Sequence, residues 1–288
     1  MLWRLERLFP DDLQARLAAC PALVLPFGTI EWHSYHLPVG LDGLVALVIS
    51  ERIAEPLGAV LAPVSYWAAG GVPYPFTLNL AGGLIEPVLT AAFEQFGAMG
   101  FRVLVAFTGH FGLEQTLVLK RAALTVMRRS PVLILPLTEY DLVTELYVGD
   151  HAGIGETSLL WAVAPDLVRL GQLPADRVLD GVLGADPRPT ASPERGRQLL
   201  DTISTRAAAM AERLLYRTSA LDRADYLEAV AAGVRVLERT LEQRQLKPKR
   251  EVPALTTPAY LDYCRALYAG DYRLACSRAE QKWGALDH

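Results

Sequence analysis

The chain has 288 residues, of which 51% are hydrophobic and 21% charged, and its formal net charge is −4. Such a composition is typical of an ordered globular protein with a sizeable core, and it excludes intrinsic disorder. The acidic balance offers no basic surface, and no apolar run approaches the roughly 18 residues of a membrane helix, so we expect neither a nucleic-acid nor a membrane partner.

Alternating apolar runs and helical patterns organise the first 217 residues. The pattern predicts helices near residues 11–20, 43–55, 87–99, 113–129, from about 157, and 194–217, and strands near 22–26, 59–63, 102–107 and 131–136. This alternation is the signature of an α/β fold with a mostly parallel sheet. In such sheets, ligands gather at the carboxyl ends of the strands.

Two further segments lie outside this alternation. Residues 65–83 are rich in Gly, Pro and aromatic side chains and predict a long loop, either a pocket wall or a cover over the sheet edge. Residues 218–288 predict a helical extension, so we place a boundary near Thr218 after a domain of residues 1–217. The extension is expected to pack on the core or on a neighbouring subunit.

The cysteines and the N-terminus point to a reducing compartment. Cys20, Cys264 and Cys276 are scattered and lack C-x-x-C spacing, so the sequence predicts neither a disulfide framework nor a thiolate zinc site. The first residues, MLWRLERLFPDD, interrupt their apolar positions with charges, unlike a secretory signal. We therefore expect a cytoplasmic protein.

The stretch LPFGTIEWHSYHLPVGLD, residues 25–42, concentrates potential metal ligands. Glu31 and His33 are two residues apart and project to one side of an extended backbone, while His36 and Asp42 follow in a loop that can curl back. Taken singly, Asp42 reads as the N-cap of the next helix. Taken together, these residues favour a metal site.

The remaining histidines fall in similar surroundings. Apart from the terminal His288, the chain holds only two more, His110 in FTGHFG and His151 in GDHAGIGETS. Each follows an apolar run and lies beside glycine, as expected for loops that leave the carboxyl ends of strands. Glu156 lies just ahead of the next predicted helix.

Imidazole and carboxylate ligands together suit zinc, manganese or iron. The five candidates are more than one tetrahedral ion needs, so we expect two divalent ions per chain, with a carboxylate such as Asp42 able to bridge them. These candidates are Glu31, His33, Asp42, His110 and Glu156. The ions would activate a water molecule as the nucleophile.

Three candidate catalytic residues lie in the last of these segments. His151 is expected to protonate the leaving nitrogen, and Asp150 beside it is a candidate acid, base or orienting group. Glu156 is expected either to bind metal or to hold His151 in the correct tautomer. For Asp150 and Glu156, plain helix capping is the competing interpretation.

Three segments together resemble the creatininase (creatinine amidohydrolase) family. They are E-W-H-S-Y-H-L-P with the following Asp42, T-G-H-F-G, and D-H-A-G-I-G-E-T-S, and the similarity spans about residues 22–217. The family's motifs read E-x-H-G-x-H-L-P…D, N-G-H-G-G-N and H-A-G-x-x-E-T-S. The resemblance implies a three-layer α/β/α fold, a two-metal centre and hydrolysis of C–N bonds.

The resemblance also implies a role for each motif residue. Glu31 and His110 would bind one metal, His33 the other, and Asp42 would bridge them. Asp150 and His151 would form the proton shuttle. His36 is assigned to the surroundings of the metal ligands, and closed homo-oligomers are expected.

The sequence departs from the family pattern at several positions. Ser34 replaces a usual Gly, and Thr108, Phe111 and Leu113 replace two Asn and a Gly of the second motif. These positions lie beside the expected metals, and we expect them to shape the substrate pocket.

Another departure concerns the second metal. In the creatinine-hydrolysing branch, a Glu two residues after the motif histidine completes this site, whereas here that position is Gly112. Glu114, Glu156 or water would have to take its place. This pattern is closer to the branches that resemble formamidopyrimidine deformylases and the mycofactocin-precursor peptidase.

The sequence therefore predicts a metal-dependent amidohydrolase for a small cyclic amide, formamide or short peptide-like substrate. The alternative is a catalytically lapsed member that keeps the fold as a binding or scaffold protein. A dinuclear phosphoesterase is disfavoured, because no Arg or Lys lies in any of the three motifs.

Overall fold

Short, almost wholly apolar strands form a parallel sheet in the order β1-β3-β2-β4-β5. The computed structural model describes residues 2–147, 149–174, 179–247 and 257–286. The strands are β1 (Trp3–Arg4), β2 (Ala22–Phe27), β3 (Val60–Leu61), β4 (Val103–Thr108) and β5 (Leu133–Thr138). The parallel pairing confirms the predicted α/β class.

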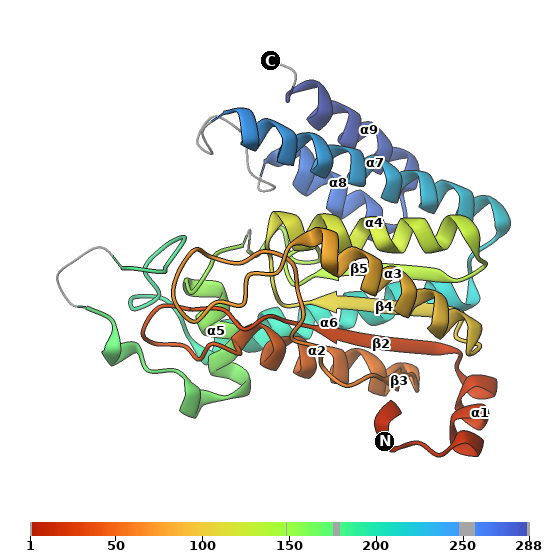
Figure 1. Cartoon of the computed structure of the whole chain (residues 1–288), viewed down its shortest axis with the longest axis horizontal. Coiled ribbons are helices and arrows are strands. Elements are labelled where there is room, and N and C mark those ends of the chain that lie inside the picture. Colours follow the sequence, from red (N-terminus) through yellow and green to blue (C-terminus); the bar gives the residue numbers. More distant parts are fainter. Residues whose placement is uncertain (1, 148, 175–178, 248–256, 287–288) are drawn as a thin grey trace.

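Helices cover both faces of this sheet (Figure 1). They are α1 (Pro10–Ala19), α2 (Leu41–Leu57), α3 (Gly82–Ala98), α4 (Leu113–Arg129), α5 (Ile154–Val163), α6 (Pro193–Tyr216), α7 (Ala220–Leu246), α8 (Pro258–Ala269) and α9 (Tyr272–Gly284). Helices α3 and α4 lie on one side of the sheet, and α2 and α6 lie on the other (Figure 1). The three-layer arrangement is therefore as expected.

The central strands end at the same level, and this positions the site. All residues of β2, β4 and β5 are buried, as expected for parallel strands covered on both faces. Phe27 pairs with Thr108, and Thr108 pairs with Thr138, so the last residues of three neighbouring strands are in register. The loops that follow these strands consequently start side by side.

Several element boundaries differ from the sequence prediction, among them those of α3, β5 and α5. Helix α3 begins at Gly82, so Pro87, which was expected at its start, is its sixth residue. Strand β5 continues to Thr138, so Glu139 follows it directly. Helix α5 begins at Ile154 rather than near residue 157, which places Glu156 within its first turn.

The helical extension packs against the domain through α7, which lies on the outer side of α4 (Figure 1). Ser219 and Asp222 form a capping box at the start of α7. The Tyr226 hydroxyl donates a hydrogen bond to the carbonyl of Ile134 in β5 at 2.7 Å. The domain boundary near Thr218 stays a prediction, although it falls between α6 and α7.

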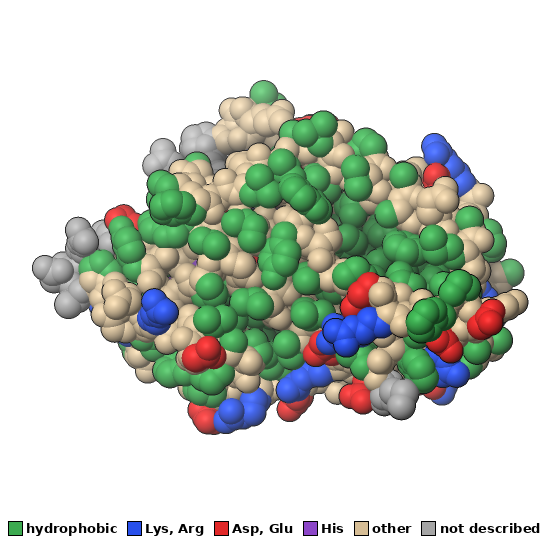
Figure 2. Space-filling view, turned by 60° about the horizontal axis from the view of Figure 1, so that its bottom comes forward, with side chains coloured by type: hydrophobic (Ala, Val, Ile, Leu, Met, Phe, Trp, Pro, Cys, Tyr) green, Lys and Arg blue, Asp and Glu red, His purple; other side chains and the backbone are tan. Residues whose placement is uncertain are grey.

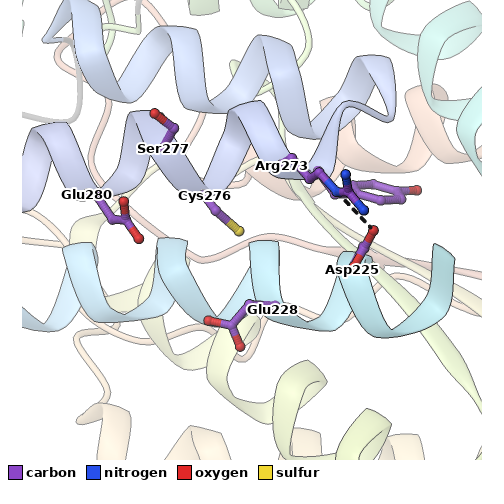
Figure 3. A pocket seen from close by; sticks show the side chains of 7 residues that line it. Asp225, Glu228, Arg273, Cys276, Ser277 and Glu280 are labelled. Carbon is purple, nitrogen blue, oxygen red and sulfur yellow. Dashed lines mark ion pairs between the residues drawn. The ribbon is translucent and has the colours of Figure 1, made fainter. Parts of the chain in front are cut away.

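Helices α7 and α9 enclose a pocket of about 320 Å³ (Figure 3). Its labelled side chains include Asp225, Glu228, Arg273 and Cys276, and Arg273 lies 3.9 Å from the Asp225 carboxylate. The three cysteines of the chain are free. This pocket contains none of the predicted site residues.

The predicted site residues are hidden from the surface. On the face drawn in Figure 2, hydrophobic side chains cover much of the area, charged ones gather near the lower rim, and hardly any histidine is visible. His33, His36, His110 and His151 are at most 8% exposed. In the part of the chain that the structure describes, no helix has the length and apolar character needed to cross a membrane.

Candidate metal centre

Two glycines allow the start of α2 to approach the ends of β2 and β4. A Cβ atom on Gly28 would lie 2.2 Å from the Gly43 nitrogen, and one on Gly109 would lie 2.3 Å from the Asp42 carbonyl oxygen. Any larger residue at either position would therefore collide with backbone. This close approach brings Asp42 between the loops that follow the two strands.

Glu31, Asp42 and His110 form the first group of potential metal ligands. The His110 Nδ1 atom lies 3.0 Å from Glu31 Oε2 and 3.3 Å from Asp42 Oδ2. Burial alone would lower the pKa of His110, but the two carboxylates outweigh it and raise this pKa to about 10 in the metal-free chain. The group thus offers one nitrogen and two carboxylates.

His33, Asp42 and Glu156 form a second group, which shares Asp42 with the first. The His33 Nε2 atom lies 3.0 Å from Asp42 Oδ1 and 3.6 Å from Glu156 Oε2. The other ring nitrogen, Nδ1, is 2.9 Å from the Glu31 carbonyl oxygen and is assigned as the donor to it. Burial alone would lower the pKa of His33, but the charge of Asp42 outweighs it and raises this pKa in the metal-free chain. A bound metal would displace the Nε2 proton, and Nε2 is directed at the carboxylates, as in metal-binding histidines.

The donor atoms of both groups fit a cation better than they fit one another. Glu31 Oε2, His33 Nε2 and both carboxylate oxygens of Asp42 are buried and have no hydrogen bond within the described residues. Buried polar atoms without a partner are costly, and cations held by the two groups would satisfy all four of these. The residues present therefore suit divalent metal.

Asp42 is not the helix cap that the sequence suggested as its simplest role. The N-cap of α2 is Gly40, no side chain caps this helix, and Asp42 is the second helical residue. Its carboxylate is fully buried and directed at His33 and His110. The capping interpretation is wrong, and Asp42 is available as a ligand.

His151 is held by a backbone hydrogen bond beside the first two groups. Its Nε2 atom lies 2.9 Å from the Trp32 carbonyl oxygen, and its Nδ1 atom lies 4.0 Å from Glu31 Oε2. Its ring centroid is 4.4 Å from that of His33. Burial, reinforced by the charge of His33, lowers the pKa of His151 to about 4 in the metal-free chain. Glu31, His33 and His151 also form a third possible ligand group.

Asp150 and Glu156 both contact the backbone at the start of α5. Asp150 accepts hydrogen bonds from the backbone nitrogens of Gly155 at 2.8 Å and Glu156 at 3.3 Å. Glu156 Oε2 accepts one from the Ala152 nitrogen at 2.6 Å. Asp150 thus satisfies free N–H groups of the helix, and its catalytic role stays a prediction. No hydrogen bond joins Glu156 to the described ring of His151; the Trp32 carbonyl orients that ring instead.

His36 lies outside the three ligand groups, as assigned from the sequence. Its Nε2 atom is 2.9 Å from the Thr157 hydroxyl. Burial, reinforced by the charge of His33, lowers the pKa of His36 from 6.5 to about 4 in the metal-free chain.

We expect metal-free wild type to lose about 2 kcal/mol of stability relative to His36→Gln between about pH 7 and pH 5. The unfolded imidazole binds a proton below its pKa of 6.5, whereas the buried one does so only near pH 4, so falling pH favours the unfolded wild type. Glutamine keeps a polar group near Thr157 without titrating. Urea unfolding in a chelator at both pH values measures this difference, and parallel pH profiles of the two proteins would contradict it.

The backbone explains why glycine is usual in the family at position 34. Ser34 has φ 57°, a left-handed conformation that is costly for residues other than glycine. Its buried hydroxyl has no hydrogen bond within the described residues. Ser34 therefore combines local strain with an unsatisfied polar atom.

Ser34→Gly is expected to raise the free energy of unfolding by about 1 kcal/mol, because it removes both penalties. Ser204 is a suitable control, since its hydroxyl is also buried without a described partner but its backbone is helical. Ser204→Gly removes an equally unpaired hydroxyl but puts glycine inside a helix, so it should gain about 0.5 to 1 kcal/mol less than Ser34→Gly. Urea midpoints at unchanged slope test both changes, and destabilisation by Ser34→Gly would refute the explanation.

The altered second motif leaves the ligand groups intact. The Thr108 hydroxyl accepts a hydrogen bond from the backbone nitrogen of His110 at 3.2 Å. Phe111 packs edge-on against Tyr140, with ring centroids 4.4 Å apart. A Cβ atom on Gly112 would lie 2.9 Å from His110 Nε2, so a larger residue there would crowd this ring. Leu113 is the first residue of α4.

The structure also separates the two glutamates that were considered in place of the family's missing one. Glu114 Oε1 accepts a hydrogen bond from the Gly82 nitrogen at 2.7 Å, so Glu114 is engaged at the start of α3. Glu156 lies in the second ligand group. Glu156 is therefore the better placed substitute.

Sequence reasoning missed Glu139 and Tyr140, which follow β5. Glu139 is fully buried, and neither of its carboxylate oxygens has a hydrogen bond within the described residues. Burial raises the pKa of Glu139 well above its ordinary range, reinforced by the charges of Asp42 and Asp150. The signal was available, because an acidic residue at the carboxyl end of a parallel strand meets the same criterion as His110.

The predicted loop over residues 65–83 borders the site. The Val72 nitrogen donates a hydrogen bond to Glu31 Oε1 at 2.5 Å, and Tyr74 packs edge-on against Trp32 with ring centroids 4.6 Å apart. Trp67 and Phe76 are 62% and 77% exposed. These contacts place the loop beside Glu31, and the pocket wall stays a prediction.

Comparison with known proteins gives a consistent result. The family model described as "Creatininase: Creatinine amidohydrolase" matches residues 6–211. Creatinine amidohydrolase of Pseudomonas putida is 28% identical over 216 residues, which cover 63% of this chain and 81% of that protein. The mycofactocin precursor peptide peptidase of Mycolicibacterium smegmatis is 28% identical over 161 residues, covering 53% of this chain and 62% of that protein.

A solved structure of creatinine amidohydrolase (creatininase) has the same fold. It superposes with a TM-score of 0.64 at 23% identity, and the match covers 75% of this chain and 98% of that one. Other solved creatininases of this fold include a manganese form and a Zn–Zn form.

Proposed function

The chain belongs to the creatininase family, and we propose that it is a metal-dependent hydrolase that cleaves the C–N bond of a small cyclic amide, formamide or short peptide-like substrate. The observation that carries this proposal is the sharing of Asp42 between two ligand groups, Glu31–Asp42–His110 and His33–Asp42–Glu156. Two ligand groups that share one carboxylate would suit a dinuclear centre. Zinc, manganese and iron all suit such ligands.

The buried charge supports two ions rather than one. Glu31, Asp42, Glu139 and Glu156 are each at most 3% exposed, and no described Lys or Arg forms an ion pair with any of them. When ionised, they carry four negative charges, which two divalent cations would balance. In the metal-free chain, burial keeps the pKa of Glu139 and Glu156 well above the ordinary range, so both carboxylates are fully ionised only beside cations.

The chain's own residues supply binding and proton transfer. When bound, the metal ions would polarise the substrate carbonyl and acidify a nearby water molecule. His151 donates Nε2–H to the Trp32 carbonyl, so Nδ1 is the nitrogen that takes up a proton and passes it to the leaving nitrogen. The Val72 nitrogen and His33 Nδ1 hold the Glu31 segment in place.

A phosphate ester is a poor candidate substrate by comparison. No Arg or Lys ion pair involves the ligand residues in the described chain, so a phosphate dianion would meet buried carboxylates without cationic side chains. An uncharged amide avoids this repulsion. The retained ligand groups likewise argue against a catalytically lapsed scaffold.

Metal analysis followed by activity screening tests the proposal. We expect up to two divalent ions per chain by plasma emission, and hydrolysis of at least one lactam, formamide, cyclic urea or short peptide that stops on chelation and returns with metal. Matched phosphate esters serve as the control panel. Metal-free protein that binds no added zinc, manganese or iron would refute the metal centre, and activity confined to phosphate esters would refute the substrate class.

We further propose that the protein is a cytoplasmic homo-oligomer. Leu84 and Val88, one turn apart on α3, are 65% and 63% exposed, which suits a contact between subunits. Light scattering of the full-length protein measures its mass, and a monomer at micromolar concentration would contradict this assignment.

A further inference from the structure

Helix α8 of the extension reaches the segment that follows β5. The Tyr268 hydroxyl donates a hydrogen bond to Asp141 Oδ2 at 2.9 Å, and Arg265 Nε donates one to the Thr144 hydroxyl at 2.9 Å. Cys264 Sγ lies 3.7 Å from Asp141 Oδ1. Three side chains of one helix therefore hold residues 141–144 from the outside.

Asp141 is the centre of this contact. Its Oδ2 atom also accepts hydrogen bonds from Lys120 Nζ at 2.8 Å and from the Thr138 nitrogen at 3.0 Å. Asp141, Lys120 and Tyr268 are 4%, 2% and 8% exposed. Buried charge-assisted hydrogen bonds fix geometry strongly, because a carboxylate that loses a donor here cannot turn to water instead.

The residue before Asp141 contacts the proposed metal centre. The Tyr140 hydroxyl lies 3.5 Å from Glu156 Oε1 and donates a hydrogen bond to the Asp150 carbonyl at 3.2 Å. Glu139, buried without a hydrogen bond among the described residues, comes immediately before Tyr140. The same short segment therefore bonds to the extension on one side and to the site on the other.

The extension lies outside the part of the chain that matches the family. The family model ends at residue 211, and α7 begins at Ala220. The solved creatininase is matched over 98% of its length by only 75% of this chain. The contact with Asp141 is thus an addition to the shared fold.

We propose that Tyr268 and Lys120 act as positioning residues through Asp141, so that the C-terminal extension sets the placement of Glu139 and Tyr140 at the metal centre. The inference rests on the proposed function in that it concerns the same site. It assigns the extension a role in that site, beyond covering α4.

Tyr268→Phe tests this role, with Tyr226→Phe as the matched control. Both changes remove one buried hydroxyl of the extension that bonds to the region of β5, but Tyr226 bonds to Ile134 in mid-strand. In the metal-free protein, we expect amide hydrogen exchange in residues 139–147 to rise about tenfold in Tyr268→Phe. It should stay at the wild-type rate in Tyr226→Phe.

Cobalt(II) gives a second readout at the site itself. We expect the visible absorption spectrum of the cobalt-loaded protein to change, and cobalt to dissociate several-fold more readily, in Tyr268→Phe but not in Tyr226→Phe. Should wild type bind no cobalt, the proposed metal centre fails, and positioning is then judged by exchange in residues 152–157, which Tyr140 contacts through Glu156.

Three results would overturn the inference. One is wild-type exchange in residues 139–147 of Tyr268→Phe, and another is an equal rise there in Tyr226→Phe, which would indicate general loosening. The third is faster exchange in that segment with an unchanged cobalt spectrum, or, without cobalt, unchanged exchange in residues 152–157. Each would leave α8 as a purely structural cover.

Discussion

Asp42→Ala is expected to weaken divalent-metal binding by more than about 100-fold, beyond the loss caused by removing a group that only supports a ligand. Asp42 belongs to both ligand groups, with Oδ1 3.0 Å from His33 Nε2 and Oδ2 3.3 Å from His110 Nδ1. Its loss should therefore affect both ions. Plasma emission after dialysis against a defined free metal concentration measures the retained metal.

Two variants serve as controls for this result. His36→Gln removes a buried imidazole that lies outside the ligand groups, so its metal content should stay close to that of wild type. Asp42→Asn keeps the size of the side chain but removes its charge, and should fall between wild type and Asp42→Ala. Equal metal content in Asp42→Ala and wild type would show that Asp42 is not a ligand.

The location of the site was predictable because it follows from strand geometry. Once the strands were recognised as parallel, their carboxyl ends had to share one edge, which brings Glu31 of the β2 loop and His110 of the β4 loop together. In the structure, His110 Nδ1 lies 3.0 Å from Glu31 Oε2. The residues of the first ligand group are thus brought together by the parallel arrangement of the strands, which the apolar runs of the sequence predict.

Other parts of the site depend on details that patterning does not reveal. The end of β5 was placed two residues early, at Pro136, so Glu139 was not considered at a strand end. The left-handed backbone of Ser34 follows from how its loop closes. Asp150 ahead of α5 has the same sequence signature whether it caps a helix or transfers protons.

Contacts between distant residues were beyond sequence reasoning altogether. Lys120 and Tyr268 are 148 positions apart, yet their side chains lie 3.1 Å from one another. Both bond to the same oxygen of Asp141. Apolar spacing predicted that the extension forms helices, but the polar residues that decide where α8 contacts the domain carry no periodic signal.

His151→Ala is expected to reduce kcat by roughly 10² to 10⁴, the range for loss of a general acid or base, while metal content stays near that of wild type. The Trp32 carbonyl fixes Nε2 of this imidazole and leaves Nδ1 on the side of Glu31. Burial, reinforced by the charge of His33, lowers the pKa of His151 to about 4, so in the metal-free chain the ring is neutral at pH 7 and able to accept a proton.

The measurement separates proton transfer from metal binding, because His151 also belongs to the group Glu31–His33–His151. Steady-state kinetics on a substrate found by screening, together with plasma emission on the same preparation, give both quantities. No cysteine lies in the motifs, and no serine lies in a nucleophile-elbow pattern, so water is expected as the nucleophile and no acyl-enzyme should form. Full activity in His151→Ala, or a trapped acyl-enzyme in mass spectrometry, would refute this mechanism. Loss of metal from His151→Ala in step with activity would instead make His151 a ligand.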